Sequence, residues 1–379
     1  MSLIKENMTT KKKVIIIIAI ILVLSSGLFF WKADNILNKI STEGGLLSSI
    51  TKSLPGVSSK LDGEEEGRIN ILLLGMRGEN VGGGGLLADT IMIASIKPEQ
   101  KKVSIVSIPR DFFVTVPESG SQQKINAVYF YGEEKKKGSG GIRYMKQVVS
   151  EIFGQPIHYA MTINFAGFEQ LVDAIGGVDI HLDEPFSEPL QFHQEHVCDP
   201  TVFTISSGNF EQKIDHRGKI VAQYPLCYNH DEECGGSFNL SAGEVHLDGE
   251  NALCYVRSRM TSNDFERARR QQEIIQKIKD KALSVGTLAN INKVNDILDS
   301  LGNNTRTDLE GWEMKRFLDL YNEMTTEGAN IEVKQKVLEN TEEGLLYNPT
   351  DYPPEVGYIL LPRGGNYDRI KTMFSTIVE

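Results

Sequence analysis

The chain has 379 residues, 40% of them hydrophobic, and a formal net charge of −11 at pH 7. This length is enough for one large hydrophobic core or two smaller ones. The negative balance argues against nucleic acid as a partner, because a nucleic-acid-binding surface needs excess positive charge to neutralise phosphates.

An uncharged apolar run, Val14–Trp31, directly follows the lysines Lys11–Lys13. A helix of this length spans about 27 Å, close to the roughly 30 Å hydrocarbon core of a bilayer. The run predicts a single transmembrane helix with residues 1–13 in the cytoplasm and the rest of the chain outside. A cleaved signal peptide is the alternative, but no small-residue cleavage site follows the run. Residues 32–67 are polar and glycine-rich, and they predict a juxtamembrane stalk.

Strands and helices alternate along residues 68–284. Short apolar runs predict strands, and helical periodicity predicts helices; these segments are Ile69–Gly75, Ile91–Ile96, Val103–Ile108, Ile142–Phe153, Phe165–Ile175 and Val178–Leu182. The alternation predicts an α/β fold in which a layered sheet is flanked by helices. Residues 285–379 either complete this domain or flank it; their predicted elements are the helices Ile291–Leu301 and Leu309–Met324 and the strands Ile331–Val337 and Gly357–Leu361.

Three of the four cysteines, Cys198, Cys227 and Cys234, fall in a turn-rich segment at about residues 193–236, which predicts an insertion. A zinc site with nearby histidines is conceivable, but the spacing matches no standard zinc signature. Outside the cytoplasm a disulfide is favoured, and Cys198 is expected to pair with Cys227 or Cys234. Cys254 lies in the apolar run ALCYV, which predicts a strand, and we expect a buried thiol there.

Arginine is concentrated between Tyr255 and Gln272. Arg257 and Arg259 alternate at strand spacing, and Arg267 and Arg270 share one face of the helix expected to follow. Because Ser262, Asn263 and Asp264 are candidate N-caps, these two arginines fall near the positive end of that helix, where cations are unfavourable. A phosphate or pyrophosphate held by the arginines and the helix N-terminus would compensate. A solvated basic face with exposed ion pairs is the alternative.

Several short motifs occur in one order across Ile69–Lys281: ILLLG, LADT, VSIPRD, KIN, FEQLVDAIGGV, LDGENALCYVRSR and DFERARRQQ. In this combination the chain resembles the LytR–CpsA–Psr family of cell-envelope proteins. The resemblance implies residues 68–284 as an extracytoplasmic catalytic domain on a membrane anchor. It also implies a metal-assisted phosphotransferase, which moves a glycopolymer from a polyprenyl-pyrophosphate carrier to peptidoglycan or another glycan acceptor.

Site residues carried over from the resemblance are of two kinds. Those expected to be catalytic are Asp89, Arg110, Asp264 and Arg267, where Asp264 either orients an arginine or acts as the base on the acceptor hydroxyl. Those expected to bind substrate are Lys124, Asn126, Arg257, Arg259, Arg270 and Gln271. Mg²⁺ is the expected cofactor, because it prefers carboxylate and phosphate oxygens, with Asp89 as its ligand.

The chain departs from the family pattern in its metal-binding half. The family usually has an aspartate two residues after the glycine of LLLG, and Arg77 stands there. Glu79 is the nearest replacement ligand. Leu87 and Ala88 stand where an arginine is common, and Glu266 replaces a usual glycine. Two other functions therefore stay open, namely hydrolysis of a polyprenyl-pyrophosphate saccharide and non-catalytic binding of a lipid-linked polymer.

Overall fold

The computed structural model describes residues 60–78, 85–188, 205–215, 217–228, 238–258, 262–282, 302, 304–326, 331–351 and 357–377. Among these residues no helix is both long and apolar enough to cross a membrane. The predicted cytoplasmic tail, transmembrane helix and most of the predicted stalk lie outside the described residues, as does the predicted helix Ile291–Leu301.

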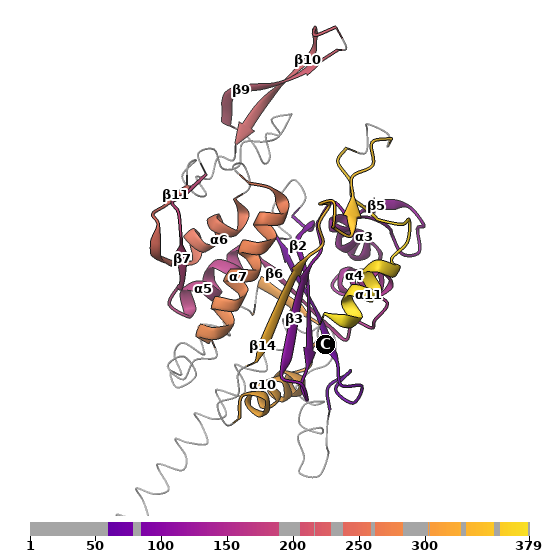
Figure 1. The fold of residues 1–379 in the computed structure, drawn as a ribbon, viewed down its shortest axis with the longest axis vertical. Helices are drawn as coiled ribbons and strands as arrows, with labels where there is room; N and C mark the ends of the chain where they lie inside the picture. The colour runs from indigo at the N-terminus through magenta and orange to yellow at the C-terminus, as the bar shows by residue number, and fades with distance from the viewer. Residues whose placement is uncertain are drawn as a thin grey trace, which may run out of the picture.

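A six-stranded mixed sheet forms the centre of the molecule (Figure 1), with the strand order β13-β6-β1-β2-β3-β14. Its strands are β1 (Ile69–Met76), β2 (Ala88–Lys97), β3 (Lys102–Ser107), β6 (Tyr159–Asn164), β13 (Thr305–Thr307) and β14 (Glu332–Val337). β2 is antiparallel to β1 and β3, whereas β6 is parallel to β1 and β14 is parallel to β3. The C-terminal part thus completes the central sheet, because it contributes both edge strands.

Helices cover both faces of this sheet because its strands are apolar on both sides. Leu72 and Leu74 of β1 pack on one face with α3 (Val128–Lys135), α4 (Gly140–Phe153) and α11 (Asp368–Thr376). Ile69 and Ile71 pack with α10 (Gly311–Thr325) on the other. Such two-sided burial explains the nearly continuous apolar runs from which these strands were predicted. The predicted layered α/β fold is confirmed.

A third hydrophobic cluster lies beside the sheet and contains α5 (Phe165–Ala174), α6 (Gly249–Arg257) and α7 (Asp264–Ala282). The paired strands β7 (Val178–Leu182) and β12 (Gly243–Leu247) belong to it. Four further strand pairs are β4 (Phe113–Thr115) with β5 (Gln122–Lys124), β8 (Phe186–Glu188) with β11 (Phe238–Leu240), β9 (Ile205–Ile214) with β10 (Ile220–Tyr228), and β15 (Leu346–Tyr347) with β16 (Leu361–Pro362). A 3-10 turn, η1 (Ile125–Ala127), precedes α3.

The segment that contains Cys254 is a helix, so the strand predicted for ALCYV was wrong. Asp248 is the N-cap of α6, and its carboxylate accepts a hydrogen bond from the backbone N–H of Asn251. Because α6 is buried on most of its sides, its apolar run has the same appearance as a buried strand. The expected free thiol was also wrong, since Cys254 is disulfide-bonded. The predicted pairing of Cys198 lies outside the described residues.

The folded domain begins earlier than the predicted stalk boundary at Gly67. Leu61 is buried in the hydrophobic cluster that contains Tyr159, and the backbone N–H of Asp62 donates to the Tyr159 hydroxyl at 2.8 Å. Glu64 forms an ion pair with Arg316 of α10. The last residues of the predicted stalk are therefore fixed to the domain by apolar and charged contacts.

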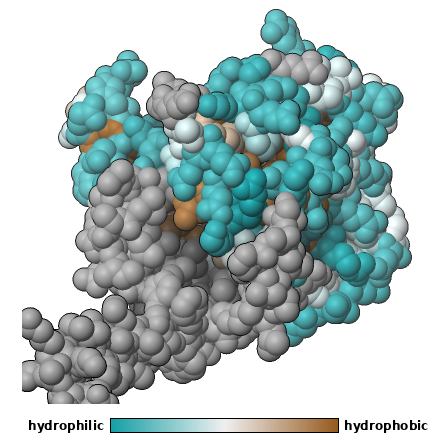
Figure 2. All heavy atoms as spheres, turned by 90° about the horizontal axis from the view of Figure 1, so that it is seen from below, coloured by the Kyte–Doolittle hydropathy of each residue, from teal (hydrophilic) through white to brown (hydrophobic). Residues whose placement is uncertain are grey.

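Viewed from the end that carries α10, the described surface is mostly hydrophilic, with small apolar patches (Figure 2).

Candidate functional site

A cluster of charged side chains lies at one end of the central sheet, where β2 begins, β3 ends and α7 begins. Antiparallel pairing brings two of these points together. Met92 pairs with Ser107, and Asp89 stands three residues before Met92 whereas Arg110 stands three residues after Ser107. Asp89 also falls at an irregularity of the β1–β2 pair, since Gly75 pairs with Thr90 and Met76 with Ala88. A bulge of this kind re-aims a side chain out of the regular ladder.

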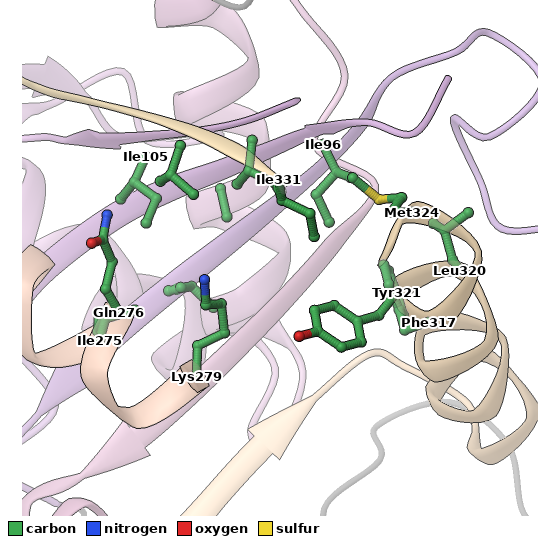
Figure 3. A pocket seen from close by; sticks show the side chains of 14 residues that line it. Ile96, Ile105, Ile275, Gln276, Lys279, Phe317, Leu320, Tyr321, Met324 and Ile331 are labelled. Carbon is green, nitrogen blue, oxygen red and sulfur yellow. The ribbon is translucent and has the colours of Figure 1, made fainter. Parts of the chain in front are cut away.

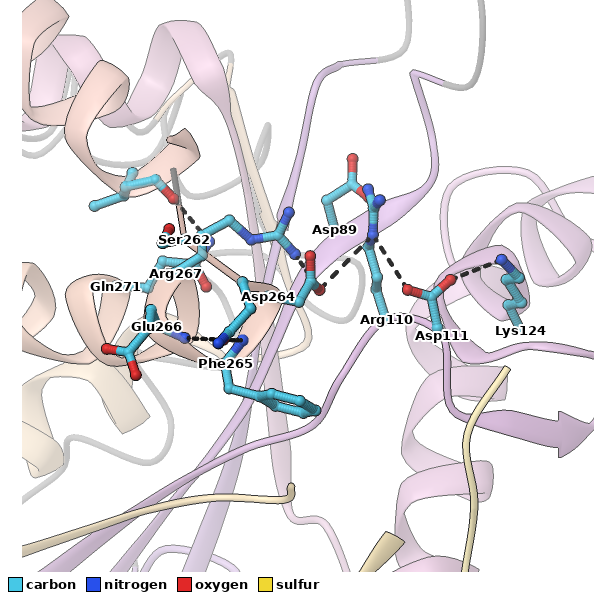
Figure 4. A network of polar contacts seen from close by, with 12 residues as sticks. Asp89, Arg110, Asp111, Lys124, Ser262, Asp264, Phe265, Glu266, Arg267 and Gln271 are labelled. Atoms are coloured by element: carbon cyan, nitrogen blue, oxygen red, sulfur yellow. Dashed lines mark hydrogen bonds and ion pairs between the residues drawn. The ribbon is translucent and has the colours of Figure 1, made fainter. Parts of the chain in front are cut away.

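Arg110 is the centre of the cluster (Figure 4). Its Nη1 atom donates a hydrogen bond to Oδ1 of Asp89 at 2.8 Å. Its Nε atom lies 3.7 Å from Oδ2 of Asp111 and 3.9 Å from Oδ2 of Asp264. At the two ends of the cluster, Lys124 Nζ lies 2.7 Å from Asp111 Oδ1, and Arg267 Nη2 lies 2.8 Å from Asp264 Oδ2. Three carboxylates thus alternate with three cations.

The surroundings of Arg110 keep it charged. Burial by itself disfavours the guanidinium, but attraction from Asp89, Asp264 and Asp111 outweighs burial and raises the pKa of Arg110. The cluster is also partly open to solvent, because the Arg110 and Asp89 side chains are 23% and 28% exposed. A ligand can therefore reach these groups without unfolding of the site.

The start of α7 explains how Asp264 and Arg267 face this cluster. Asn263 is the cap residue, and its Oδ1 accepts hydrogen bonds from the backbone N–H groups of Phe265 and Glu266. Asp264 stands in the first turn, where the helix dipole favours a negative charge. The cation Arg267 is unfavourable there, and Asp264, three residues earlier, compensates for it within the same turn.

Arg270 has a different position from the one that the sequence predicted. Its guanidinium is buried and donates to the backbone carbonyls of Tyr255, at 3.1 Å, and of Ser258. Gln271 similarly donates to the carbonyl of Val256 at 3.2 Å. The last carbonyls of a helix have no partner within that helix and carry a partial negative charge. Arg270 and Gln271 therefore cap the C-terminus of α6. Burial lowers the pKa of Arg270, and attraction from nearby groups such as Glu188 and Glu273 offsets this only in part.

The remaining predicted site residues differ in what they contact, and some of them lie outside the described residues. Lys124 belongs to the cluster through Asp111. The backbone N–H of Asn126 donates to the carbonyl of Arg110 at 3.3 Å, which supports the loop that carries Arg110. The guanidinium of Arg257 stacks over the ring of Phe165 at 4.3 Å. Arg259 and Glu79 lie outside the described residues.

The described residues contain no group of three or more histidine, cysteine, aspartate or glutamate side chains that could hold a metal ion. Asp89, Asp111 and Asp264 each have a cationic partner within 3 Å. Mg²⁺ in phosphate chemistry needs only one or two protein carboxylates, because phosphate oxygens and water supply the rest. The donor set is consistent with an ion shared with a phosphate, and it does not form an all-protein cage.

An apolar cavity of about 240 Å³ lies against the sheet face covered by α10. Figure 3 shows its lining side chains projecting from the sheet, from α7 and from α10. Ile105 of β3 and Ile275 of α7 contribute to its wall. Ile275 is eleven residues after Asp264, about 16 Å along the helix. The same strand and the same helix therefore connect the charged cluster to an apolar cavity.

Two residues next to the cluster were not predicted as site residues. Asp111 bridges Arg110 and Lys124. Tyr358 lies near Asp111 and Asp264, and its side chain is exposed. Its segment, VGYILL, carries no motif that would distinguish it from an ordinary strand.

Comparison with known proteins is consistent with these observations. Polyisoprenyl-teichoic acid–peptidoglycan teichoic acid transferase TagU of Oceanobacillus iheyensis is 31% identical over 260 residues, which cover 68% of this chain and 64% of that protein. TagU of Enterococcus faecalis is 26% identical over 80% of this chain and 84% of its own. The solved structure of TagT bound to LI-WTA has the same fold, with a TM-score of 0.52 and 22% identity over 83% of this chain and 92% of that one. The LytR_cpsA_psr family model matches residues 37–351, and the chain belongs to the LytR–CpsA–Psr family.

Proposed function

We propose that this protein is a phosphotransferase that moves a glycopolymer from a polyprenyl-pyrophosphate carrier to a glycan acceptor of the cell wall. Curated relatives are named for transfer of teichoic acid to peptidoglycan, which supports this class of reaction. The observation that carries the proposal is the placement of Arg110 and Arg267 at the end of a sheet whose face holds an apolar cavity. An amphiphile with a charged head and an apolar chain matches these two neighbouring environments.

The reaction forms one phosphodiester and breaks one pyrophosphate bond. A hydroxyl oxygen of the acceptor attacks the phosphorus that bears the saccharide, and the bridging P–O bond breaks so that polyprenyl phosphate leaves. The hydroxyl proton passes to a base. Phosphoryl transfer mostly requires positioning and neutralisation of charge, which guanidinium groups provide. Arg110 and Arg267 would bind the pyrophosphate, and Lys124 would add a further positive charge.

Asp264 is engaged by Arg267 at 2.8 Å and lies 3.9 Å from Arg110 Nε. A carboxylate between two guanidinium groups fixes the direction of both. We therefore assign Asp264 to orienting the arginines, rather than to accepting the proton of the acceptor hydroxyl.

Asp89 would contribute the protein carboxylate to Mg²⁺, together with phosphate oxygens of the substrate. When bound, Mg²⁺ would neutralise charge that develops on the phosphates. Without substrate, the Asp89 carboxylate is held by Arg110 at 2.8 Å. Binding of a pyrophosphate to Arg110 would offer the guanidinium a new partner and leave Asp89 available to the metal.

The apolar cavity would accommodate part of the polyprenyl chain. Its wall combines strand residues such as Ile96 with Phe317 and Met324 of α10. The Val14–Trp31 segment would anchor the chain in the membrane with its catalytic domain outside, close to a lipid-linked donor. Glycopolymer, lipid carrier and acceptor would therefore meet at the same side of the membrane.

Incubation of the full-length chain with a polyprenyl-pyrophosphate saccharide and soluble peptidoglycan fragments tests this proposal. We expect mass spectrometry to detect a phosphodiester-linked adduct and polyprenyl phosphate. The yield should rise with Mg²⁺, and Asp89→Asn should weaken that dependence. Release of glycosyl phosphate without an adduct would support a hydrolase instead. Binding without turnover for every acceptor would support a non-catalytic polymer-binding protein.

A further inference from the structure

The C-terminal part brings a tyrosine and an asparagine to the edge of the charged cluster. Leu360 forms a parallel bridge with Phe112, and its backbone N–H donates to the carbonyl of Asp111 at 2.9 Å. Tyr358 precedes Leu360 by two residues, and Arg110 precedes Phe112 by two residues, so the parallel pairing brings Tyr358 toward Arg110. On the other side, Val337 of β14 pairs with Ser107, and Asn340 and Arg110 stand three residues further on. Two distant segments thus converge beside Arg110.

Tyr358 is held in place while its ring stays accessible. Asn340 Nδ2 donates a hydrogen bond to the Tyr358 hydroxyl at 3.1 Å. Asn348 Nδ2 donates to the carbonyl of the next residue, Ile359, at 2.7 Å. The Tyr358 side chain is nevertheless 47% exposed. A large aromatic ring fixed by its backbone and its hydroxyl, but open to solvent, loses little conformational entropy when a ligand covers it.

The charges near Tyr358 indicate which part of a substrate it would contact. Burial raises the pKa of Tyr358, and the nearby carboxylates Asp111 and Asp264 raise it further, so the hydroxyl stays protonated. These carboxylates can accept hydrogen bonds from the hydroxyl groups of a neutral sugar. The aromatic face suits the apolar face of a sugar ring, and the amide of Asn340 offers further hydrogen bonds.

We propose that Tyr358 and Asn340 form a subsite that binds a sugar ring of the acceptor glycan and so presents its hydroxyl to the pyrophosphate. This inference rests on the proposed transferase function. Tyr358 lies beyond residue 351, where the match to the family model ends, so the family match does not assign it a role.

Steady-state transfer by the full-length chain, measured at saturating donor with increasing soluble peptidoglycan fragment, tests the subsite. We expect Tyr358→Ala to raise the KM for the acceptor about tenfold, with the KM for the donor unchanged. Tyr358→Phe keeps the ring and should recover most of the affinity, and Asn340→Ala should give an intermediate value. Phe210→Ala is the matched control, because Phe210 is a similarly exposed aromatic residue on β9.

The outcomes separate the two proposals. An acceptor KM that is unchanged in both Tyr358→Ala and Asn340→Ala would overturn the subsite, and so would an equal rise in the KM for the donor. Melting temperatures should match the wild type, because the substituted ring is exposed. If the wild-type chain itself forms no adduct with any acceptor, the proposed function fails first, and the subsite fails with it.

Discussion

Arg110 Nη1 lies 2.8 Å from Asp89 Oδ1, and this ion pair joins the residue that follows Pro109 to the second residue of β2. The pair depends on the antiparallel arrangement of β2 and β3, which brings the start of one strand to the end of the other. Through Asp264 the same guanidinium also reaches α7. With Lys124 of β5, the charged cluster is therefore built from four parts of the fold, and a change in one of its members affects the others.

Arg110→Ala should reduce turnover by about 100-fold or more, because it removes a donor aimed at the phosphates and leaves three carboxylates without their shared cation. Arg269→Ala is the control, since Arg269 is exposed and pairs with Glu266 and Glu339, neither of which is a member of the charged cluster. Turnover of both variants is measured by adduct formation. Equal activity of the two variants would contradict the role of Arg110.

Arg270→Ala should lower the free energy of unfolding by about 2 to 4 kcal/mol, because it leaves buried carbonyls at the end of α6 without donors. Its effect on activity should follow from loss of structure and not from loss of a phosphate contact. Urea denaturation measures the change, and Arg269→Ala should stay within about 0.5 kcal/mol of the wild type. A fully stable Arg270→Ala chain that has lost donor binding would restore the phosphate-binding role predicted from the sequence.

Glu64→Gln should destabilise the protein at about pH 7, and the difference from the wild type should disappear on acidification. Burial would raise the pKa of Glu64, but hydrogen bonds and attraction from Arg316 outweigh it, so the pKa is lowered below its ordinary 4.5. A group with a lowered folded-state pKa contributes stability above the unfolded value, and this stability is lost as the pH falls through the folded value.

Urea denaturation of both chains at about pH 7 and about pH 3 checks this prediction, with an expected difference of about 1 to 2 kcal/mol at the higher pH. Lys315→Met is the control, because Lys315 forms an exposed pair with Asp319 on the same helix. If Glu64→Gln were as stable as the wild type at both values, the segment from Leu61 to Gly67 would not be fixed by this contact.

Cys254→Ser should lower the free energy of unfolding by about 2 to 5 kcal/mol, because Cys254 is disulfide-bonded and almost fully buried. Thermal denaturation with and without reductant measures the effect. Reduction should bring the wild-type chain close to the variant. A melting temperature that reductant leaves unchanged would count against a structural disulfide at this position.

The sequence by itself determined four of the six strands of the central sheet, β1, β2, β3 and β14. Ile69–Met76, Ala88–Lys97 and Lys102–Ser107 bury side chains on both faces, and a short, nearly continuous apolar run is the pattern expected of such a strand. It also indicated the family, because the motifs around Asp89, Arg110 and Asp264 occur together in one order, and the family model confirms that membership. The same reasoning failed for the run that ends at Val256, since a helix buried on most of its sides is as apolar as a strand.

Only the tertiary structure decided which arginine has which role. Arg267 and Arg270 are three residues apart on one helix, yet Arg267 faces Asp264 and the cluster while Arg270 faces the end of α6. Their neighbours come from other segments, and helical spacing contains no information about them. Tyr358 is a further case, because the parallel bridge between Phe112 and Leu360 joins residues far apart in the chain. Local sequence fixes which side chains share a face, whereas long-range pairing fixes what that face meets.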